Sequence, residues 1–279
     1  MGGEVRTYAF SLGFLFREKE VMSTAFVTLC DKSYYEKARR TIEELKTNGG
    51  WKGDIVLIAV DFNPDLIDGV EIRHVSHLNT DKLFEQWDVY PLTPMSDNRH
   101  RGKVYQWDKL QVFTSSFQRW DRIVFIDAGT RIFDSVQPLL DLPWHGQILA
   151  PDDSDPYDNG NRFETQLELS ANPPVAERFF EEFPGDCLRR NYFLNCIFLF
   201  DTALIDRLPN LEDMMNRYPI FRCNEMGLMN LVFTIQLNCW TPFPQRVGDK
   251  YLFAWCESNY KENSDWRMFH FIKYSVTHP

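Results

Sequence analysis

The stretch "RWDRIVFIDAGTRIF", residues 119–133, contains an apolar run from Ile123 to Ile126 that ends in a single carboxylate, Asp127. A run of apolar residues with β-branched and aromatic members is typical of a buried strand. In open parallel sheets, ligands bind beyond the carboxyl ends of the strands. The sequence therefore predicts that Asp127 faces a binding crevice, with a turn or helix-cap role as the alternative.

The first 60 residues predict a β-α-β unit. Residues 24–30 and 54–60 are apolar runs with strand character, and "NGGWKGD" interrupts the chain before the second. Ser33 and Glu36 have the spacing of a capping box, which would open a helix between the strands. The helix would bury one stripe, formed by Tyr35, Ala38, Ile42 and Leu45.

The remaining pattern continues the same alternation of strands and helices. It predicts an α/β fold with a mostly parallel central sheet, in one domain at 23–279 behind an N-terminal extension, 1–22. The other predicted elements are a short strand within 70–75, helices at 105–118 and 225–236, and strands at 122–126, 147–151 and 193–200.

Composition limits the classes of function. The 279 residues carry 30 Lys and Arg against 40 Asp and Glu, a net charge of −10, which disfavours nonspecific nucleic-acid binding. None of the six cysteines forms a C-x-x-C pair, so a structural zinc site is not expected. Free thiols in the cytoplasm are favoured over disulfides. The apolar stretch "AFSLGFLF" is too short to cross a membrane, which takes about 20 residues.

Several segments, taken in order over about residues 24–273, resemble the glycogenin-like (family 8-type) glycosyltransferases. They are "AFVTLCDKSYYEKA", "YQWDKLQVF", "DRIVFIDAGTRIFDSVQPLLDL", "ILAPD" followed by "LNCIFLF", "EMGLMNLVF" and "FHFIKY". The resemblance implies a GT-A fold and transfer of a sugar from a nucleotide diphosphate, UDP in the first instance, to a glycan or other hydroxyl acceptor. It also implies a manganese ion and retention at the anomeric carbon.

The resemblance assigns the metal, Mn²⁺ or Mg²⁺, to Asp127 and His270. A divalent cation would neutralise the departing diphosphate as a Lewis acid, and carboxylate and imidazole ligands suit Mn²⁺. The sequence departs from the family at Gly129, which stands where a second acid is expected. A core role for His270 and replacement of the metal by cations both stay open. The cations near the site by motif are Lys109, Arg131 and Lys273.

Donor contacts are implied at both ends of the chain. Thr28, Leu29 and Tyr35 match positions that contact the nucleotide base, where backbone groups and an aromatic face can recognise uracil. Lys109 and Lys273 would meet the phosphates as point charges. The alternatives are core packing for Leu29 and Tyr35, and a solvated helix charge for Lys109.

At the reacting centre, the resemblance points to Asp152, Asn195 and Glu225. Asn195 can bind sugar hydroxyls as donor and acceptor. A carboxylate near the anomeric carbon can stabilise positive charge or accept the proton of the acceptor hydroxyl. Glu225 stands where the family has Asp, so an inverting reaction stays open. The different-class alternative is an inactive relative that binds nucleotide or glycan.

Overall fold

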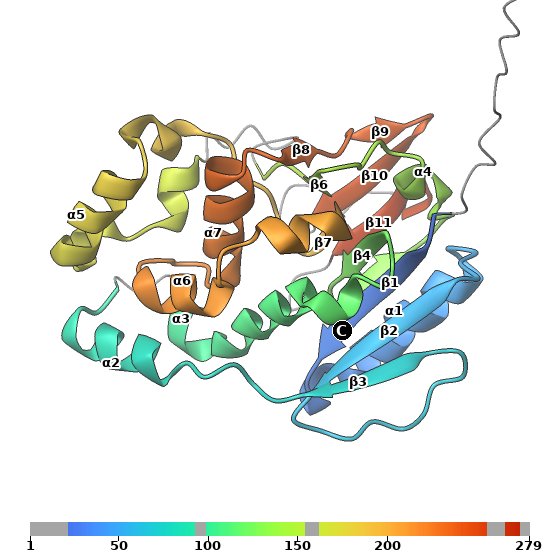
Figure 1. Ribbon diagram of the computed structural model, residues 1–279. Helices are drawn as coiled ribbons and strands as arrows, with labels where there is room; N and C mark the ends of the chain where they lie inside the picture. Colours follow the sequence, from blue (N-terminus) through green and yellow to red (C-terminus); the bar gives the residue numbers. More distant parts are fainter. Residues whose placement is uncertain (1–21, 93–98, 154–161, 256–265, 274–279) are drawn as a thin grey trace, which may run out of the picture.

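The computed structural model describes residues 22–92, 99–153, 162–255 and 266–273. Within these ranges a central seven-stranded sheet has the order β3-β2-β1-β4-β7-β6-β8 (Figure 1). Its strands are β1 (Thr24–Cys30), β2 (Asp54–Val60), β3 (Glu71–Val75), β4 (Arg122–Ile126), β6 (Ile148–Ala150), β7 (Ile197–Asp201) and β8 (Trp240–Pro242). All neighbours pair in parallel except β7, which is antiparallel to β4 and β6. The predicted α/β class with a mostly parallel sheet is confirmed.

The predicted β-α-β unit at the start of the fold is confirmed. Strands β1 and β2 pair in parallel, and α1 (Tyr35–Thr47) connects them. The predicted capping box is wrong. Asp31 accepts hydrogen bonds from the Tyr34 N–H at 3.0 Å and the Ser33 hydroxyl at 2.7 Å, so the cap belongs to a short 3-10 turn that precedes α1.

Strand order reverses at the centre of the sheet. From β1 the chain passes to β2 on one side, whereas β4 lies on the other side of β1. This is a topological switch point, where open α/β sheets form a crevice beyond the strand ends. The strand predicted at 193–200 begins only at Ile197, and the residues before it include Phe193, which forms an isolated bridge with Asp152.

A second, four-stranded sheet has the order β5-β11-β10-β9, and is called the small sheet below. It consists of β5 (Thr130–Ile132), β9 (Arg246–Val247), β10 (Lys250–Trp255) and β11 (Phe269–Lys273). Strand β5 follows β4 after the turn at 127–129, and β11 pairs with it in the antiparallel direction, with Lys273 opposite Thr130. The small sheet therefore brings the last described segment of the chain to the end of β4.

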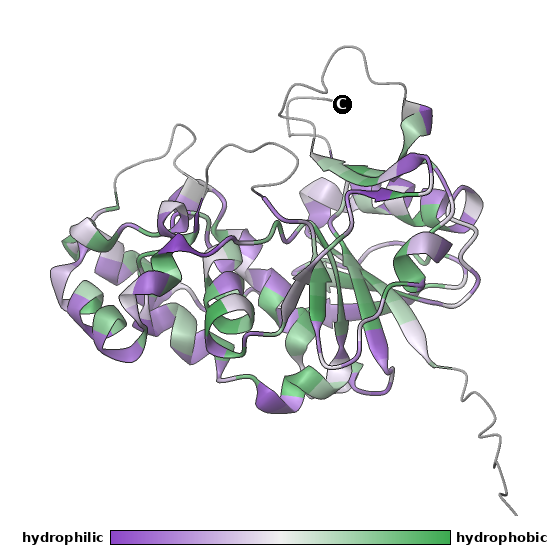
Figure 2. Cartoon of the chain, turned by 90° about the horizontal axis from the view of Figure 1, so that it is seen from above, coloured by the Kyte–Doolittle hydropathy of each residue, from purple (hydrophilic) through white to green (hydrophobic). Residues whose placement is uncertain are grey.

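Side-chain alternation along the central strands fills a core on each face of the sheet. Phe26, Val124 and Leu199 pack on the face covered by α1, and Val27, Phe125 and Phe198 pack on the other face. Each buried side chain of this size stabilises the fold by about 1.5–3 kcal/mol. In Figure 2 the hydrophobic colouring concentrates in these central strands.

Helices α2, α5 and α6 lie toward the side of the molecule away from β2, beyond α7 (Figure 1). The helix predicted at 225–236 is confirmed as α7 continued by a π-helical segment, Leu231–Gln236, and the segment predicted helical at 105–118 is largely 3-10 helix, Val104–Phe113. The α-helices not yet given are α2 (Asp81–Val89), α3 (Arg99–Gly102), α4 (Gln137–Leu140), α5 (Pro173–Glu182), α6 (Leu211–Arg217) and α7 (Glu225–Asn230).

No helix in the described ranges is long and apolar enough to span a bilayer. Cys30, Cys187, Cys196 and Cys239 are buried free thiols, as predicted for them. The predicted extension at 1–22 lies outside the described residues except for Met22, and Cys256 also lies outside them.

Candidate active site

The end of β4 meets the beginning of β7 at one edge of the central sheet. Because β7 is antiparallel to β4, the residues before β7 lie beside the residue after β4. The Asp127 N–H donates to the Cys196 carbonyl at 2.8 Å. This pairing fixes the backbone of Asp127 and places Asn195 next to it. Residues almost 70 positions apart are thus neighbours because of strand direction alone.

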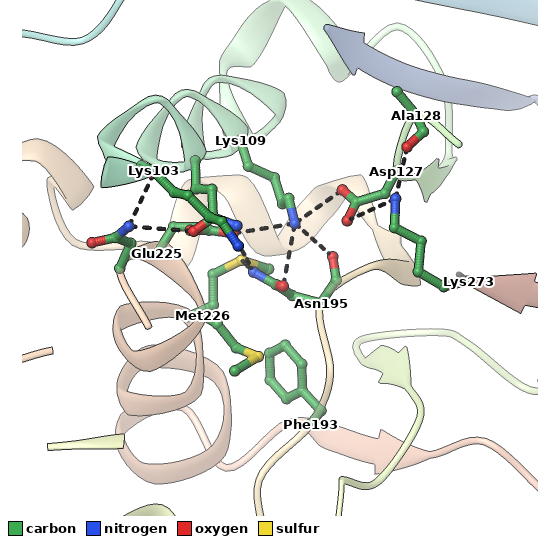
Figure 3. Close-up of polar contacts among 12 residues, drawn as sticks. Lys103, Lys109, Asp127, Ala128, Phe193, Asn195, Glu225, Met226 and Lys273 are labelled. Carbon is green, nitrogen blue, oxygen red and sulfur yellow. Dashed lines mark hydrogen bonds and ion pairs between the residues drawn. The ribbon is translucent and has the colours of Figure 1, made fainter. Parts of the chain in front are cut away.

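Lys109 joins these residues into a network with Glu225 (Figure 3). Its Nζ lies 3.0 Å from Asp127 Oδ1 and 3.2 Å from Glu225 Oε1, and it donates to the Asn195 carbonyl at 3.0 Å and side-chain oxygen at 3.2 Å. The Asn195 amide donates to Glu225 Oε1 at 2.9 Å. The four residues, here called the strand-end cluster, were all predicted as site residues. The structure brings them together.

Burial and charge act in opposite directions in this cluster. Burial alone would lower the pKa of Lys109, but the Asp127 and Glu225 carboxylates outweigh it and raise that pKa above the ordinary value. Burial raises the pKa of Glu225, although the Lys109 charge and the Asn195 hydrogen bond oppose the change. Lys109 is therefore a fixed cation, whereas Glu225 is a carboxyl group that holds its proton more tightly than usual.

The first turn of α7 aims Glu225 at the cluster. Asn224, just before the helix, has φ +50° and ψ −127°, and its amide donates to the Lys103 carbonyl at 3.0 Å. Gly227 allows α7 to approach Phe221, because a Cβ at this position would lie 2.5 Å from the Phe221 ring. Glu225 Oε2 is buried and has no hydrogen-bond partner among the described residues. The hydrogen-bonding capacity of this oxygen is therefore not used by the described residues in this conformation.

Lys273 approaches Asp127 from the small sheet. Its Nζ donates to the Ala128 carbonyl at 2.6 Å and lies 3.8 Å from Asp127 Oδ2 (Figure 3). Its side chain is 14% exposed. Burial lowers the pKa of Lys273, and the Asp127 charge opposes that change. Each oxygen of Asp127 therefore has its own ammonium neighbour, one from the 3-10 helix and one from β11.

His270 does not join Asp127. Its Nδ1 is 2.9 Å from the Ser135 carbonyl, and its own carbonyl accepts from the Phe133 N–H, so it packs over the far end of β5. His270 and Lys273 are three residues apart on one strand, which separates their Cα atoms by about 10 Å and points the side chains to opposite faces. The predicted metal pair of Asp127 and His270 is not brought together, because register places Lys273 at this point.

The described residues do not fit a divalent cation. Mn²⁺ and Mg²⁺ need several oxygen or imidazole ligands, and a positively charged neighbour repels them. Both oxygens of Asp127 face ammonium groups, and Gly129 supplies no ligand. Within the described ranges there is no group of three or more His, Cys, Asp or Glu residues that could hold a metal ion. The metal implied by the resemblance therefore disagrees with the donor set that the structure presents.

The three residues predicted to contact the base lie near the carboxyl end of β1. Thr28 Oγ1 is buried without a hydrogen-bond partner among the described residues, and Leu29 packs against the core. Tyr35 turns away from the cluster, because its hydroxyl donates to the Asp65 carbonyl at 2.9 Å and its ring packs edge-on against Phe62. The alternative of packing is the one the structure favours for Leu29 and Tyr35.

A neighbouring tyrosine pair was missed by sequence reasoning. The rings of Tyr34 and Tyr105 lie 6.4 Å apart, and Lys37 Nζ is 5.1 Å from the Tyr34 ring. Burial raises the pKa of Tyr105, and the charges of Tyr34, Asp31 and Glu225 add to it. Tyr105 is thus near enough to Glu225 to sense its charge. The adjacent aromatics in "KSYYEK" gave no signal for choosing Tyr34 over Tyr35.

Asp152 lies at the same sheet edge, just beyond β6, where it forms a bridge with Phe193. Its carboxylate accepts from the Asn191 amide at 2.9 Å. The basic residue Arg131 points elsewhere, since its guanidinium binds Glu44 at 2.6 Å. Neither residue is in the strand-end cluster, so Asp152 keeps a proposed role at the rim and Arg131 a structural one.

A second group of charges at this edge was also missed. Asp108, next to Lys109 in the chain, binds the His77 ring and accepts from the Leu78 N–H at 2.8 Å. His77 Nε2 lies 3.7 Å from Asp61, which follows β2 with φ +53°. Burial raises the pKa of Asp108, and these hydrogen bonds oppose the change. The group anchors the 3-10 helix that carries Lys109 to the ends of β2 and β3.

Comparison with known proteins gives matches among solved structures. The galactosyltransferase LgtC, in complex with donor and acceptor sugar analogs, aligns with a TM-score of 0.55 at 12% identity, over 91% of this chain and 87% of LgtC. The bifunctional glycosyltransferase WbbM gives 0.54 at 16% identity, over 92% of this chain and 46% of WbbM. The S. cerevisiae mannosyltransferase Ktr4p in complex with GDP gives 0.51 at 10% identity, over 77% of this chain and 67% of Ktr4p.

No protein-family model and no curated protein sequence matches the chain. At identities of 10–16% the structural matches establish the fold, which is the GT-A fold of these glycosyltransferases. The sequence prediction of that fold is confirmed.

Proposed function

We propose that this protein is a glycosyltransferase that moves a sugar from a nucleoside diphosphate, UDP in the first instance, to a hydroxyl of a glycan or other acceptor. The observation that carries the proposal is the strand-end cluster. A cation and two carboxylates meet at the switch point of a GT-A fold, and one carboxylate has a buried oxygen that no described residue hydrogen-bonds. The fold supports the reaction class, and the cluster supplies the chemistry that this reaction needs.

The first requirement of sugar transfer is a place for negative charge. When the bond between the anomeric carbon and the phosphate oxygen breaks, both electrons stay with the nucleoside diphosphate. Preorganised positive groups lower the barrier, because they need no reorganisation as this charge develops. Lys109 is positive through its raised pKa and is held by Asp127, Asn195 and Glu225. Its proposed role is to supply positive charge beside the diphosphate, because its N–H groups already have acceptors within the cluster.

The second requirement concerns the reacting carbon. The acceptor oxygen forms the new bond to the anomeric carbon, and its proton must go to a base or to the departing phosphate. Glu225 Oε2 is the proposed group that faces this centre, either to stabilise positive charge on the sugar or to take the proton. Asn195 orients Glu225 through its amide hydrogen bond. Asp152 is proposed to contact acceptor or sugar hydroxyls from the rim.

The proposal includes neither the predicted metal nor a fixed stereochemistry. The residues near Asp127 do not fit a divalent cation, so no step depends on one. Retention, implied by the resemblance, is the first expectation, and inversion with Glu225 as base is the alternative. We place the reaction in the cytoplasm, on the argument that buried free thiols such as Cys30 and Cys196 suit a reducing compartment.

A donor screen tests the proposal. The full chain is incubated with a set of UDP-sugars, without acceptor and with simple glycosides, in EDTA and in Mn²⁺, and UDP release is measured. We expect release from at least one donor, and expect Glu225→Gln to abolish most of it. Lys250→Met is the matched control, because this lysine pairs with Asp134 in the small sheet, outside the strand-end cluster.

Two results would contradict the proposal. If UDP binds but no donor is turned over under any condition, the protein is the inactive binding relative. If wild type and Glu225→Gln release UDP equally, the cluster is not the catalytic centre.

A further inference from the structure

Gly129 and Lys273 occupy one place in the site. A Cβ built on Gly129 would lie 3.9 Å from Lys273 Nζ and 3.4 Å from Lys37 Cδ. The lysine amine therefore stands beside the point from which a side chain at residue 129 would extend. Gly129 has φ +86°, in the region that L side chains rarely adopt. The backbone thus favours glycine here, and the nearest side-chain charge is positive.

The charges at this edge are balanced before any ligand arrives. Two carboxylates, Asp127 and Glu225, face two ammonium groups, Lys109 and Lys273, so the formal sum is zero. Lys37 adds a half-buried cation from α1, near enough for its charge to lower the pKa of Lys273. Lysines from three elements thus converge on one strand end, which suits an incoming polyanion better than a divalent cation.

Lys273 keeps hydrogen-bonding capacity for such a ligand. An ammonium group has three N–H donors. Among the described residues Lys273 donates one hydrogen bond, to the Ala128 carbonyl, and its 3.8 Å separation from Asp127 is an ion pair beyond hydrogen-bond length. At least one N–H is therefore left to point at a phosphate oxygen, and β11 holds the amine in place before binding.

We propose that Lys273, with the positive charge of Lys109 behind it, takes the place of a metal ion and binds the diphosphate of the donor directly, so that the site works without a divalent cation. This inference rests on the proposed glycosyltransferase function. It adds that the site differs in charge from a metal-binding site. With Gly129 in place of an acid and the Lys273 amine beside it, the site would bind the diphosphate rather than a divalent cation.

Binding of UDP and of uridine to the full chain tests the inference by calorimetry, in EDTA and then in Mn²⁺. We expect wild type to bind UDP equally well in both. Lys273→Met is expected to weaken UDP binding in EDTA by about tenfold or more, since a hydrogen bond to a charged group is lost. Its uridine affinity should not change, because uridine has no phosphate. Lys273→Arg should keep most of the UDP affinity.

Lys250→Met is the control for loss of a lysine in the small sheet, and it should bind UDP like wild type. UDP binding by wild type that requires Mn²⁺ would overturn the inference and leave the proposed function intact, whether or not the Lys273 variants fold. Equal UDP affinity of Lys273→Met and wild type in EDTA would also overturn it. Absence of UDP binding under both conditions would contradict the proposed function itself.

Discussion

The strand-end cluster and the small sheet meet at Asp127 but differ in how they are built. The cluster takes its members from the ends of central strands, from α7 and from the 3-10 helix Val104–Phe113, which are fixed by a large core on both sheet faces. The small sheet supplies Lys273 from a strand of five residues that pairs with the three residues of β5 on one side and with β10 on the other. The difference teaches that a large core fixes the residues of the strand-end cluster, whereas the register of a short strand decides which cation lies beside Asp127.

Among the variants of the strand-end cluster, Lys109→Met should cause the largest loss of stability and activity. The change leaves two carboxylates near each other without the cation between them, and breaking a buried ion pair typically costs about 3–5 kcal/mol. Urea unfolding measures the loss, and donor turnover should fall below detection. A loss of stability no larger than that of Lys250→Met would show that the cluster is not held by its charges.

The strand-end cluster was predictable because hydrophobic pattern fixes its elements. Asp127 closes an apolar strand and Glu225 opens an apolar helix, so both lie at boundaries visible in the sequence, whereas Asn195 was expected inside the strand at 193–200. Strands at such boundaries share one sheet edge, and the resemblance supplied their order. The sequence placed these residues in one site, but the ion pairs that Lys109 makes with Asp127 and Glu225 were not predicted.

The position of Lys273 in the small sheet could not be predicted, because the hydrophobic pattern of the sequence does not determine how β11 is registered against β5. Lys273 and His270 lie on one apolar strand, and a shift of one residue would exchange the faces that they occupy. Similarly, the choice between Tyr34 and Tyr35 depends on a 3-10 turn capped by Asp31, which the capping-box pattern at Ser33 concealed. The missed residues are those placed by local geometry rather than by burial.

Glu225→Gln should reduce donor turnover by about 10²–10⁴-fold, the usual range for loss of an acid–base group, while Gln keeps the size of the side chain. The raised pKa of Glu225 gives a second readout. The native state holds this proton more tightly than the unfolded chain, so the stability it contributes is full below pH about 4 and falls as pH rises through the native pKa.

The pH series separates the two roles of this carboxyl group. Relative to wild type, Glu225→Gln should become progressively more stable between pH 4 and neutral pH, as measured by urea unfolding at each pH. A difference in free energy of unfolding that does not change with pH would mean that burial does not shift this group. Unchanged turnover would remove Glu225 from the reaction.

Gly129→Asp tests whether the Lys273 amine, which the small sheet supplies, keeps a divalent cation away from Asp127. It restores the acid that the resemblance expects, but at φ +86° an L side chain costs about 1–2 kcal/mol. We expect the new carboxylate to pair with Lys273 and to weaken UDP binding in EDTA. Gly50→Asp is the control, because Gly50 has φ +70° and no atom of the described residues lies within 4 Å of its Cβ position, so it carries similar strain away from the site.

Strong Mn²⁺ binding by Gly129→Asp with Lys273 still present would contradict the view that this amine excludes a cation. Equal UDP affinity of Gly129→Asp and wild type would show that the diphosphate lies elsewhere.

His270→Asn should have the smallest effect, and it separates the two readings of the C-terminal strand most directly. An Asn amide nitrogen can replace Nδ1 as donor to the Ser135 carbonyl, so the expected cost is about 1 kcal/mol, the scale of one altered hydrogen bond. If the strand register places Lys273 rather than His270 at the site, UDP binding in EDTA and donor turnover of His270→Asn should both equal those of wild type.

Thermal unfolding measures the stability cost of His270→Asn. Lys273→Met is assayed alongside and should show the reverse: it should lose UDP affinity with little change in the unfolding midpoint. Loss of turnover in His270→Asn that added Mn²⁺ restores would mean that the imidazole does serve a metal, and that the small sheet adopts another register when the donor is bound.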